Sequence, residues 1–396
     1  MKKSVAIIGG GPAALLLAAF LDSEKFEITI YEKNKSLARK FLVAGNGGFN
    51  LSHGESIRDM LIRYTPITFL NEALLGFDNT DLCKYLASID IPTFVGSSNR
   101  IYPKKGIKPI AVLRAILKVL STNNCNIIYQ EKWNGWSSSG ALKFESGLEV
   151  KSDFTVFSMG AASWKKTGSL GDWLSLFTEK EIATKPFEVS NCAFEVAWGK
   201  PFLEKCEGNP LKNITISCGG KTQKGEVIIT QFGLEGNAIY GLSPEIRQQL
   251  KTKGTAIISI DLKPSLSIDK ILSKLTKSTA KNTSLKLKND LNLSATQLNL
   301  FKSVVSKETF LDLYALAKTI NNLKLIIHST APLDEGISCV GGILLEEVSS
   351  SFELKKIPKH YCIGEMLDWD APTGGYLLQA CFSMGVSVAR ELNLKD

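Results

Sequence analysis

The chain has 396 residues, of which 44% are hydrophobic and 22% are charged, and its formal net charge is +8. This balance excludes an intrinsically disordered chain and predicts a globular protein with ample core. Its eight cysteines form no Cys-x-x-Cys pair, so we expect buried reduced thiols in a cytoplasmic protein, with neither a disulfide framework nor a metal site.

The N-terminal segment combines a basic start, MKKS, with an apolar run over residues 5–21. That pattern also occurs in signal peptides. We favour a strand, a turn and a helix, because glycines and a proline at 9–12 interrupt the run and a second apolar segment ending in an acid follows it. Residues 4–9 and 26–32 are therefore predicted strands, joined by a helix in a βαβ unit. No other stretch approaches the roughly 20 apolar residues of a membrane span.

The stretch IIGGGPAA places Gly9, Gly11 and Ala14 at the positions of the dinucleotide fingerprint G-x-G-x-x-G/A. Gly9 allows the tight turn, Gly11 lets the backbone approach a pyrophosphate, and the small Ala14 lets the helix pack on the strand. Glu32 ends the second strand, where a carboxylate accepts hydrogen bonds from ribose hydroxyls. An acid here disfavours a 2′-phosphate, so the sequence predicts FAD or NAD rather than NADP.

Further elements of this first region follow in chain order. Residues 57–90 and 108–120 are predicted helices. We expect three strands to return to the same sheet, at 125–130, 141–146 and 154–160. The last of these ends in small residues at Met159 and Gly160, which fits a third nucleotide-binding fingerprint.

The pattern changes near Pro186, where short strands alternate with turns over 188–198, 212–218, 225–233 and 254–262. This alternation predicts an all-β insert. From 265 to 321 apolar residues recur at helical spacing, with Ser267, Ser294 and Lys307 near the expected helix starts. Strands return at 323–330 and 359–364, and a final helix covers about 375–392.

The basic excess is local. Residues 251–324 hold 13 lysines against five acids, and the rest of the chain is balanced. A solvated helical surface explains this excess, while electrostatic guidance of an anionic partner, including nucleic acid, stays open as an alternative.

The C-terminal segment distinguishes between FAD and NAD as the predicted cofactor. Its sequence, YCIGEMLDWDAPTGGYLLQACFSMG, predicts a strand, then Gly364-Glu365, a loop, and a helix that starts at Gly374-Gly375-Tyr376. In two-domain flavoproteins a strand–glycine–acid element of this type binds the ribityl chain and a phosphate. The helix that follows points its positive N-terminus at the flavin edge that becomes negative on reduction. This pattern favours FAD.

These stretches carry a family resemblance. Together with ARKFLVAGNGGFNLSH, FVGSSNRIYPK, SMGAASWKKTGSLGDW, TQFGLEGNAIYGLS and CVGGI, they resemble a bacterial family of NAD(P)/FAD-dependent oxidoreductases that includes aminoacetone oxidase-like enzymes. The family lies within the two-dinucleotide-binding-domain flavoprotein superfamily. The resemblance implies an α/β fold in which a Rossmann-like FAD-binding domain is interrupted by a β-barrel-like domain carrying a small helical insert. The expected domains are FAD-binding at 1–188 and 332–396, β-barrel-like at 189–264 and 322–331, and helical at 265–321.

The resemblance also implies residue roles. Glu32 would meet the adenosine ribose, the loop Gly45–Asn50 would lie beside the flavin, and Trp133 would meet the adenine through its backbone. Many members read Gly-Gly-Arg-Cys-Asn where this chain has Gly47-Gly48-Phe49-Asn50, so substrate chemistry does not carry over at this loop. The full expected cofactor-binding set is Gly9, Gly11, Pro12, Ala13, Ala14, Glu32, Lys33, Lys40, Gly45, Gly47, Gly48, Asn50, Trp133, Met159, Gly160, Gly364, Glu365, Gly374, Gly375 and Tyr376.

The resulting functional prediction is an FAD-dependent oxidoreductase with an unidentified small-molecule substrate. Hydride would pass through the flavin, and the electron partner would be NAD(P)H or O2. The alternatives are a flavin-containing binding or RNA-related protein that uses the basic helical module, and plain NAD binding without flavin. The sequence singles out no catalytic acid or base and no oligomeric state. His53, Arg100 and Tyr102 could face the site or be structural, while His328 and Tyr240 are expected in the core.

Overall fold

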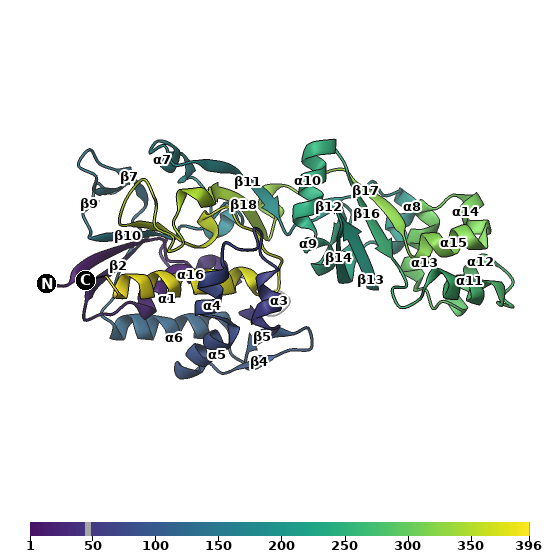
Figure 1. The fold of residues 1–396 in the computed structure, drawn as a ribbon, viewed down its shortest axis with the longest axis horizontal. Helices are drawn as coiled ribbons and strands as arrows, with labels where there is room; N and C mark the ends of the chain where they lie inside the picture. The colour runs from purple at the N-terminus through teal and green to yellow at the C-terminus, as the bar shows by residue number, and fades with distance from the viewer. Residues whose placement is uncertain (44–48, 396) are drawn as a thin grey trace. The chain divides into compact units, whose positions relative to one another are not determined.

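The computed structural model describes residues 1–43 and 49–395 (Figure 1). The chain divides into two compact units, one formed by Met1–Val189 with Leu333–Asp396 and the other by Ser190–Pro332. Among the described residues no helix is long and apolar enough to cross a membrane. The three-domain division stays a prediction.

The first unit is built on a parallel sheet with the strand order β19-β10-β1-β2-β6. Its strands are β1 (Lys3–Ile8), β2 (Phe26–Glu32), β6 (Asn126–Tyr129), β10 (Phe154–Phe157) and β19 (His360–Cys362). Val5–Ile8 are buried without alternation, as expected for a strand covered on both faces. The predicted βαβ unit and the Rossmann-like part of the fold are therefore confirmed.

Helix α1 (Pro12–Phe20) packs against the C-terminal helix α16 (Tyr376–Asn393) and against α6 (Pro109–Thr122) beneath this sheet (Figure 1). The close approach of α1 and α16 needs Gly385, because a Cβ there would lie 2.3 Å from the carbonyl oxygen of Ala13. Helices from the first and last segments of the chain thus pack together.

Smaller elements surround this core. The predicted helical region 57–90 consists of α3 (Ile57–Leu61), α4 (Asn71–Gly76) and α5 (Asn79–Ser88). Two small antiparallel sheets have the orders β3-β5-β4 and β7-β8-β9, and β11 pairs with β18. Their strands are β3 (Ser52–His53), β4 (Thr93–Val95), β5 (Arg100–Pro103), β7 (Trp133–Trp136), β8 (Leu142–Phe144), β9 (Glu149–Val150), β11 (Thr184–Ser190) and β18 (Ser338–Ile343).

The prediction that 141–146 returns to the main sheet was wrong. This segment is β8, which pairs antiparallel with β7 and β9. Gly140 and Gly147 adopt positive φ values on either side of it, so the chain reverses direction at each end and forms a local meander.

The second unit contains an antiparallel sheet in the order β12-β15-β14-β13-β16-β17. Its strands are β12 (Phe194–Glu195), β13 (Pro210–Cys218), β14 (Lys221–Ile229), β15 (Gly233–Glu235), β16 (Ala256–Asp261) and β17 (Leu323–Ile327). The chain just after β17 returns to β12, where Glu195 N–H donates to Ser329 O at 2.9 Å and His328 N–H donates to Glu195 O at 3.0 Å. These bonds close the sheet, which confirms the predicted barrel-like fold.

The inserted region is not all β. Helices α8 (Lys200–Cys206), α9 (Asn237–Tyr240) and α10 (Ser243–Lys253) lie within it. The helical segment beyond it comprises α11 (Ile268–Thr276), α12 (Thr283–Asn289), α13 (Ala295–Val304), α14 (Lys307–Leu311) and α15 (Leu313–Ile320). Ser267 and Ser294 cap α11 and α13 as expected, each accepting a backbone N–H in the first turn.

Candidate nucleotide-binding site

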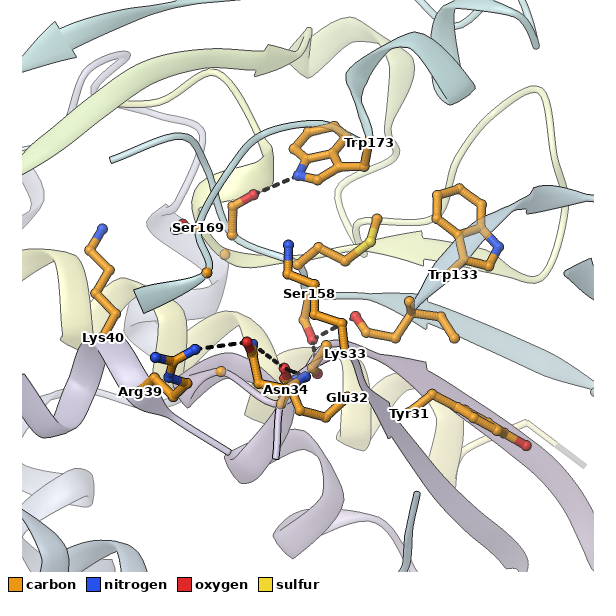
Figure 2. Close-up of a pocket in the computed structure, with 18 of the residues that line it drawn as sticks. Tyr31, Glu32, Lys33, Asn34, Arg39, Lys40, Trp133, Ser158, Ser169 and Trp173 are labelled. Carbon is orange, nitrogen blue, oxygen red and sulfur yellow. Dashed lines mark hydrogen bonds between the residues drawn. The ribbon is translucent and has the colours of Figure 1, made fainter. Parts of the chain in front are cut away.

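A pocket of about 330 Å³ opens at the carboxyl ends of the parallel strands in the first unit (Figure 2). Its lining includes the last residues of β1 and β2 and the residues that directly follow β1, β2, β10 and β19. This edge of an open α/β sheet is where nucleotide ligands bind. The volume lies at the lower end of the range for small-molecule and cofactor sites.

The turn between β1 and α1 forms one wall. Gly9 has φ of 94°, and a Cβ there would lie 2.8 Å from the carbonyl oxygen of Ser158, so only glycine fits. Pro12 occupies the first turn of α1, and the N-cap residue Gly11 provides no side-chain cap. The N–H groups of Ala13 and Ala14 therefore lack a partner in the described chain, as required for an anion to bind at a helix N-terminus.

Glu32 ties the end of β2 to this turn. It is buried, with 7% exposure, and its Oε2 accepts the N–H of Gly10 at 2.9 Å. Its Oε1 accepts the backbone and side-chain N–H groups of Asn34 at 2.8 and 2.6 Å. Oε2 keeps a free lone pair, since a carboxylate oxygen accepts two hydrogen bonds. The predicted ribose acceptor thus lies at the turn with unused capacity.

Trp133 supplies an unsatisfied donor. Its indole is 4% exposed and packs against Trp136, Phe157 and Phe177. Its Nε1–H is buried and has no hydrogen-bond partner. A buried unpaired N–H costs about 1–3 kcal/mol. The free N–H groups of α1 and the carboxylate of Glu32 fit a dinucleotide.

An ion pair at the pocket joins a residue from the N-terminal part of the chain to one from the C-terminal part. Lys40, on α2 (Arg39–Val43), places its Nζ 2.9 Å from Glu365 Oε2 and 2.8 Å from Ser163 Oγ. Glu365 lies in the short helix η4 (Gly364–Met366) that follows β19. Burial lowers the pKa of Lys40, but the Glu365 carboxylate outweighs it and raises the pKa above its usual value. Lys40 is therefore charged at neutral pH.

Most of the predicted cofactor-binding residues meet in this pocket. Those that line it are Gly9, Gly11, Pro12, Ala13, Glu32, Lys33, Lys40, Trp133, Met159, Gly160, Gly364 and Glu365. Ala14 is buried behind the turn, and Asn50 is half-buried away from the lining. Gly45, Gly47 and Gly48 lie outside the described residues.

Gly374, Gly375 and Tyr376 form a second group next to β3. A Cβ on Gly375 would lie 2.3 Å from the carbonyl carbon of Ser52, and the ring of Tyr376 stacks on His53 at 4.9 Å. Cys381, on the same helix, lines the pocket. At 1.5 Å per residue it lies roughly 7.5 Å along the helix from Tyr376. The two groups are therefore about one and a half turns apart.

Several pocket residues were not predicted. Arg39 donates from Nη1 to Asn34 Oδ1 at 2.8 Å, which extends the Glu32 chain of bonds (Figure 2). Trp173 Nε1 donates to Gly160 O at 2.9 Å. Arg39 directly precedes the predicted residue Lys40 and Asn34 directly follows the predicted residue Lys33, but neither belonged to a motif. Over 1–43 and 49–395, no cluster of His, Cys, Asp or Glu suited to a metal ion is found.

A glycine turn after the first strand and an acid at the end of the second, on a parallel sheet edge, define a dinucleotide-binding α/β protein. The chain belongs to the HI0933-like Rossmann domain family, whose model matches residues 3–391. It is 22% identical to a 3-dehydro-bile acid delta(4,6)-reductase of Clostridium scindens, over 98% of both chains. It is equally identical to a ribosomal RNA dihydrouridine synthase of Haemophilus influenzae, over 98% of both chains.

Among solved structures, a flavocytochrome c3 fumarate reductase in its open conformation matches with a TM-score of 0.51 and 11% identity. The match covers 100% of this chain and 79% of the other. This similarity concerns the fold alone. The family confirms the predicted flavoprotein class and supports FAD as the cofactor.

Proposed function

We propose that this protein is an FAD-dependent oxidoreductase that acts on a small-molecule substrate and either takes electrons from NAD(P)H or passes them to O2. The observation that supports this best is the joint presence of Glu32 and the uncapped α1 N-terminus in one pocket. FAD supplies the redox chemistry when bound, by accepting and returning a hydride.

The residues divide by the part of the cofactor they would hold. The N–H groups of Ala13 and Ala14 would bind the pyrophosphate, and the free acceptor of Glu32 would bind a ribose hydroxyl. Trp133, which lines the same pocket, would meet the adenine through its backbone. Lys40 and Glu365, held together by their ion pair, would position the ribityl chain and a phosphate.

The flavin ring would lie toward the second group, Gly374–Tyr376, and the loop 45–50. Gly374 and Gly375 both adopt positive φ, which favours glycine and fixes the path of the backbone at the start of α16. The protein's own contribution is to position the ring against β3 and to exclude water with buried aromatic groups such as Tyr376. No acid or base of this chain is assigned a proton transfer.

The relatives support a reducing activity. One is named a reductase of a bile acid derivative and another a dihydrouridine synthase of ribosomal RNA. Their substrates differ greatly in size, so neither transfers to this chain as a specific substrate. The lysine excess over 251–324 keeps RNA as the alternative class.

The test begins with reconstitution of the purified protein with FAD. We expect stoichiometric retention of flavin, with bleaching on anaerobic mixing with NADH or NADPH faster than free FAD, or rapid reoxidation of photoreduced flavin by O2. A protein that retains no flavin after reconstitution would contradict the proposal. Flavin retention without either reaction, together with RNA binding at physiological salt, would favour the alternative.

A further inference from the structure

Arg100 lies beside the second group of glycines. It is the first residue of β5 and pairs directly with His53 of β3. Side chains of directly opposed residues in an antiparallel pair project from the same face. A Cβ added to Gly374 would lie 3.4 Å from Arg100 Nε and 3.8 Å from Nη2. The guanidinium therefore lies against the Gly374 backbone, next to the His53–Tyr376 stack.

The nearby carboxylate, that of Glu55, already forms an ion pair with another arginine, Arg63. Arg63 donates from Nε to Glu55 Oε1 at 3.2 Å and from Nη2 to Glu55 Oε2 at 3.0 Å. This two-point pair neutralises both charges. In the described part of the chain, the Arg100 guanidinium makes no hydrogen bond and no ion pair. Its half-buried positive charge is uncompensated.

His53 adds a donor without adding charge. Burial lowers the pKa of His53, and the charges of Arg63 and Arg100 lower it further against the opposing effect of Glu55. The ring is therefore neutral at pH 7. Its Nδ1 accepts the Glu55 N–H at 3.3 Å, which leaves the proton on Nε2. The cluster His53–Arg100–Tyr376 thus has a single net positive charge and unused N–H donors.

We propose that Arg100 binds a carboxylate of the substrate, and that the substrate is consequently a small organic acid. This rests on the proposed function, because it places the acid beside the flavin end of the site. The planar guanidinium presents parallel N–H groups that match the two oxygens of a carboxylate. One uncompensated positive charge suits a monoanion better than a phosphate dianion.

The experiment measures binding rather than turnover. FAD-loaded protein is titrated calorimetrically with acetate, crotonate, benzoate and cinnamate, each paired with its uncharged amide. We expect at least one acid to bind at least tenfold more tightly than its amide. Arg100→Gln should weaken that acid roughly 10- to 100-fold, as expected for loss of a charged hydrogen-bonded pair. It should leave the affinity for the amide nearly unchanged.

Two further variants make the result specific. Arg100→Lys keeps the positive charge but lacks the two parallel N–H groups of the guanidinium. It should therefore bind the acid more tightly than Arg100→Gln and less tightly than the wild type. Arg114→Gln, on the exposed side of α6, is the matched control and should bind the acid as the wild type does. FAD content and the unfolding midpoint of each variant show that the fold and cofactor site are intact.

The outcomes separate this inference from the proposed function. A wild type that retains no FAD overturns the proposed function. A wild type that retains FAD but binds no acid more tightly than its amide overturns the role of Arg100 alone. Equal weakening by Arg100→Gln and Arg114→Gln would also overturn it.

Discussion

The carboxylate of Glu32 accepts the backbone N–H of Gly10 at 2.9 Å and is 7% exposed. This bond links the end of β2 to the glycine turn after β1, two segments that the dinucleotide motif requires to be close. The same carboxylate is therefore both a structural acceptor and the expected ribose partner.

Replacing this carboxylate separates the two roles. Glu32→Gln keeps one acceptor oxygen, whereas Glu32→Ala leaves buried N–H groups unpaired at a cost of about 1–3 kcal/mol. We expect both variants to lose FAD affinity and Glu32→Ala to lose more stability, because the glutamine oxygen still accepts part of these bonds. Glu27→Gln, on the exposed side of the same strand, is the control. Unchanged FAD dissociation constants in both Glu32 variants would contradict its assignment to the ribose.

Gly375 allows a second test, with a glycine of similar conformation as its control. Gly375 has φ of 107° and Gly106 has φ of 96°. An alanine at Gly106 would meet no described atom within 4 Å, whereas at Gly375 its Cβ would lie 2.3 Å from Ser52. Gly106→Ala should cost about 1–2 kcal/mol of backbone strain.

Gly375→Ala should lower the unfolding midpoint further and reduce FAD occupancy, because β3 and α16 must move apart. Thermal unfolding and the flavin-to-protein absorbance ratio measure both effects. Equal effects of the two substitutions would show that the close approach of Gly375 to Ser52 is unimportant.

The Lys40–Glu365 pair is expected to contribute more to stability than a surface pair. Its side chains are 29% and 15% exposed. A double-mutant cycle with Lys40→Met and Glu365→Gln should give a coupling energy of about 1–3 kcal/mol in the free energy of unfolding. The pair Lys165–Asp334, with 53% and 54% exposure at 3.1 Å, should give about 0–1 kcal/mol. Similar coupling in both cycles would argue against this prediction.

Acid sensitivity is expected at the C-terminal end of the chain. Burial raises the pKa of Glu353, but the Lys359 N–H and the side chains of Lys395 and Tyr361 outweigh it and hold the pKa below its usual value. A depressed carboxyl pKa stabilises the fold above the unfolded pKa of about 4.3, and this contribution is lost as the pH falls through the folded value.

Wild type and Glu353→Gln should therefore differ in urea midpoint at neutral pH and converge as the pH is lowered past about 4. Glu346→Gln, at an exposed position in the same segment, should show a pH profile parallel to that of the wild type. A wild-type advantage over Glu353→Gln that persists at acid pH would disprove this assignment.

The parts of the fold that depend on local pattern could be predicted from sequence. The Gly9–Ala14 turn, β2 ending at Glu32 and the Ser267 and Ser294 caps each depend on a few neighbouring residues. Helix α10 also carried local signals, since Pro244 lies in its first turn and Gly254 ends it with φ of 75°. This helix was not predicted, because it contains few apolar residues and lies in a strand-rich region.

Other features depend on contacts between distant segments. Sheet membership of β8 is decided by its partners β7 and β9 rather than by its own apolar residues. Lys40 and Glu365 are 325 positions apart, and the family pattern placed each at the cofactor but did not pair them. The unpaired charge of Arg100 could not be predicted, because it depends on Arg63 pairing with Glu55 in the folded chain.

Closure of the barrel also brings the two ends of the inserted unit together. Ala331 N–H donates to Ala193 O at 2.9 Å, while β11 and β18, which flank the insertion in the host unit, pair with each other. Each module therefore has its own chain ends next to each other. Such an arrangement lets evolution exchange or remodel the insert without changing the chain path of the nucleotide-binding core.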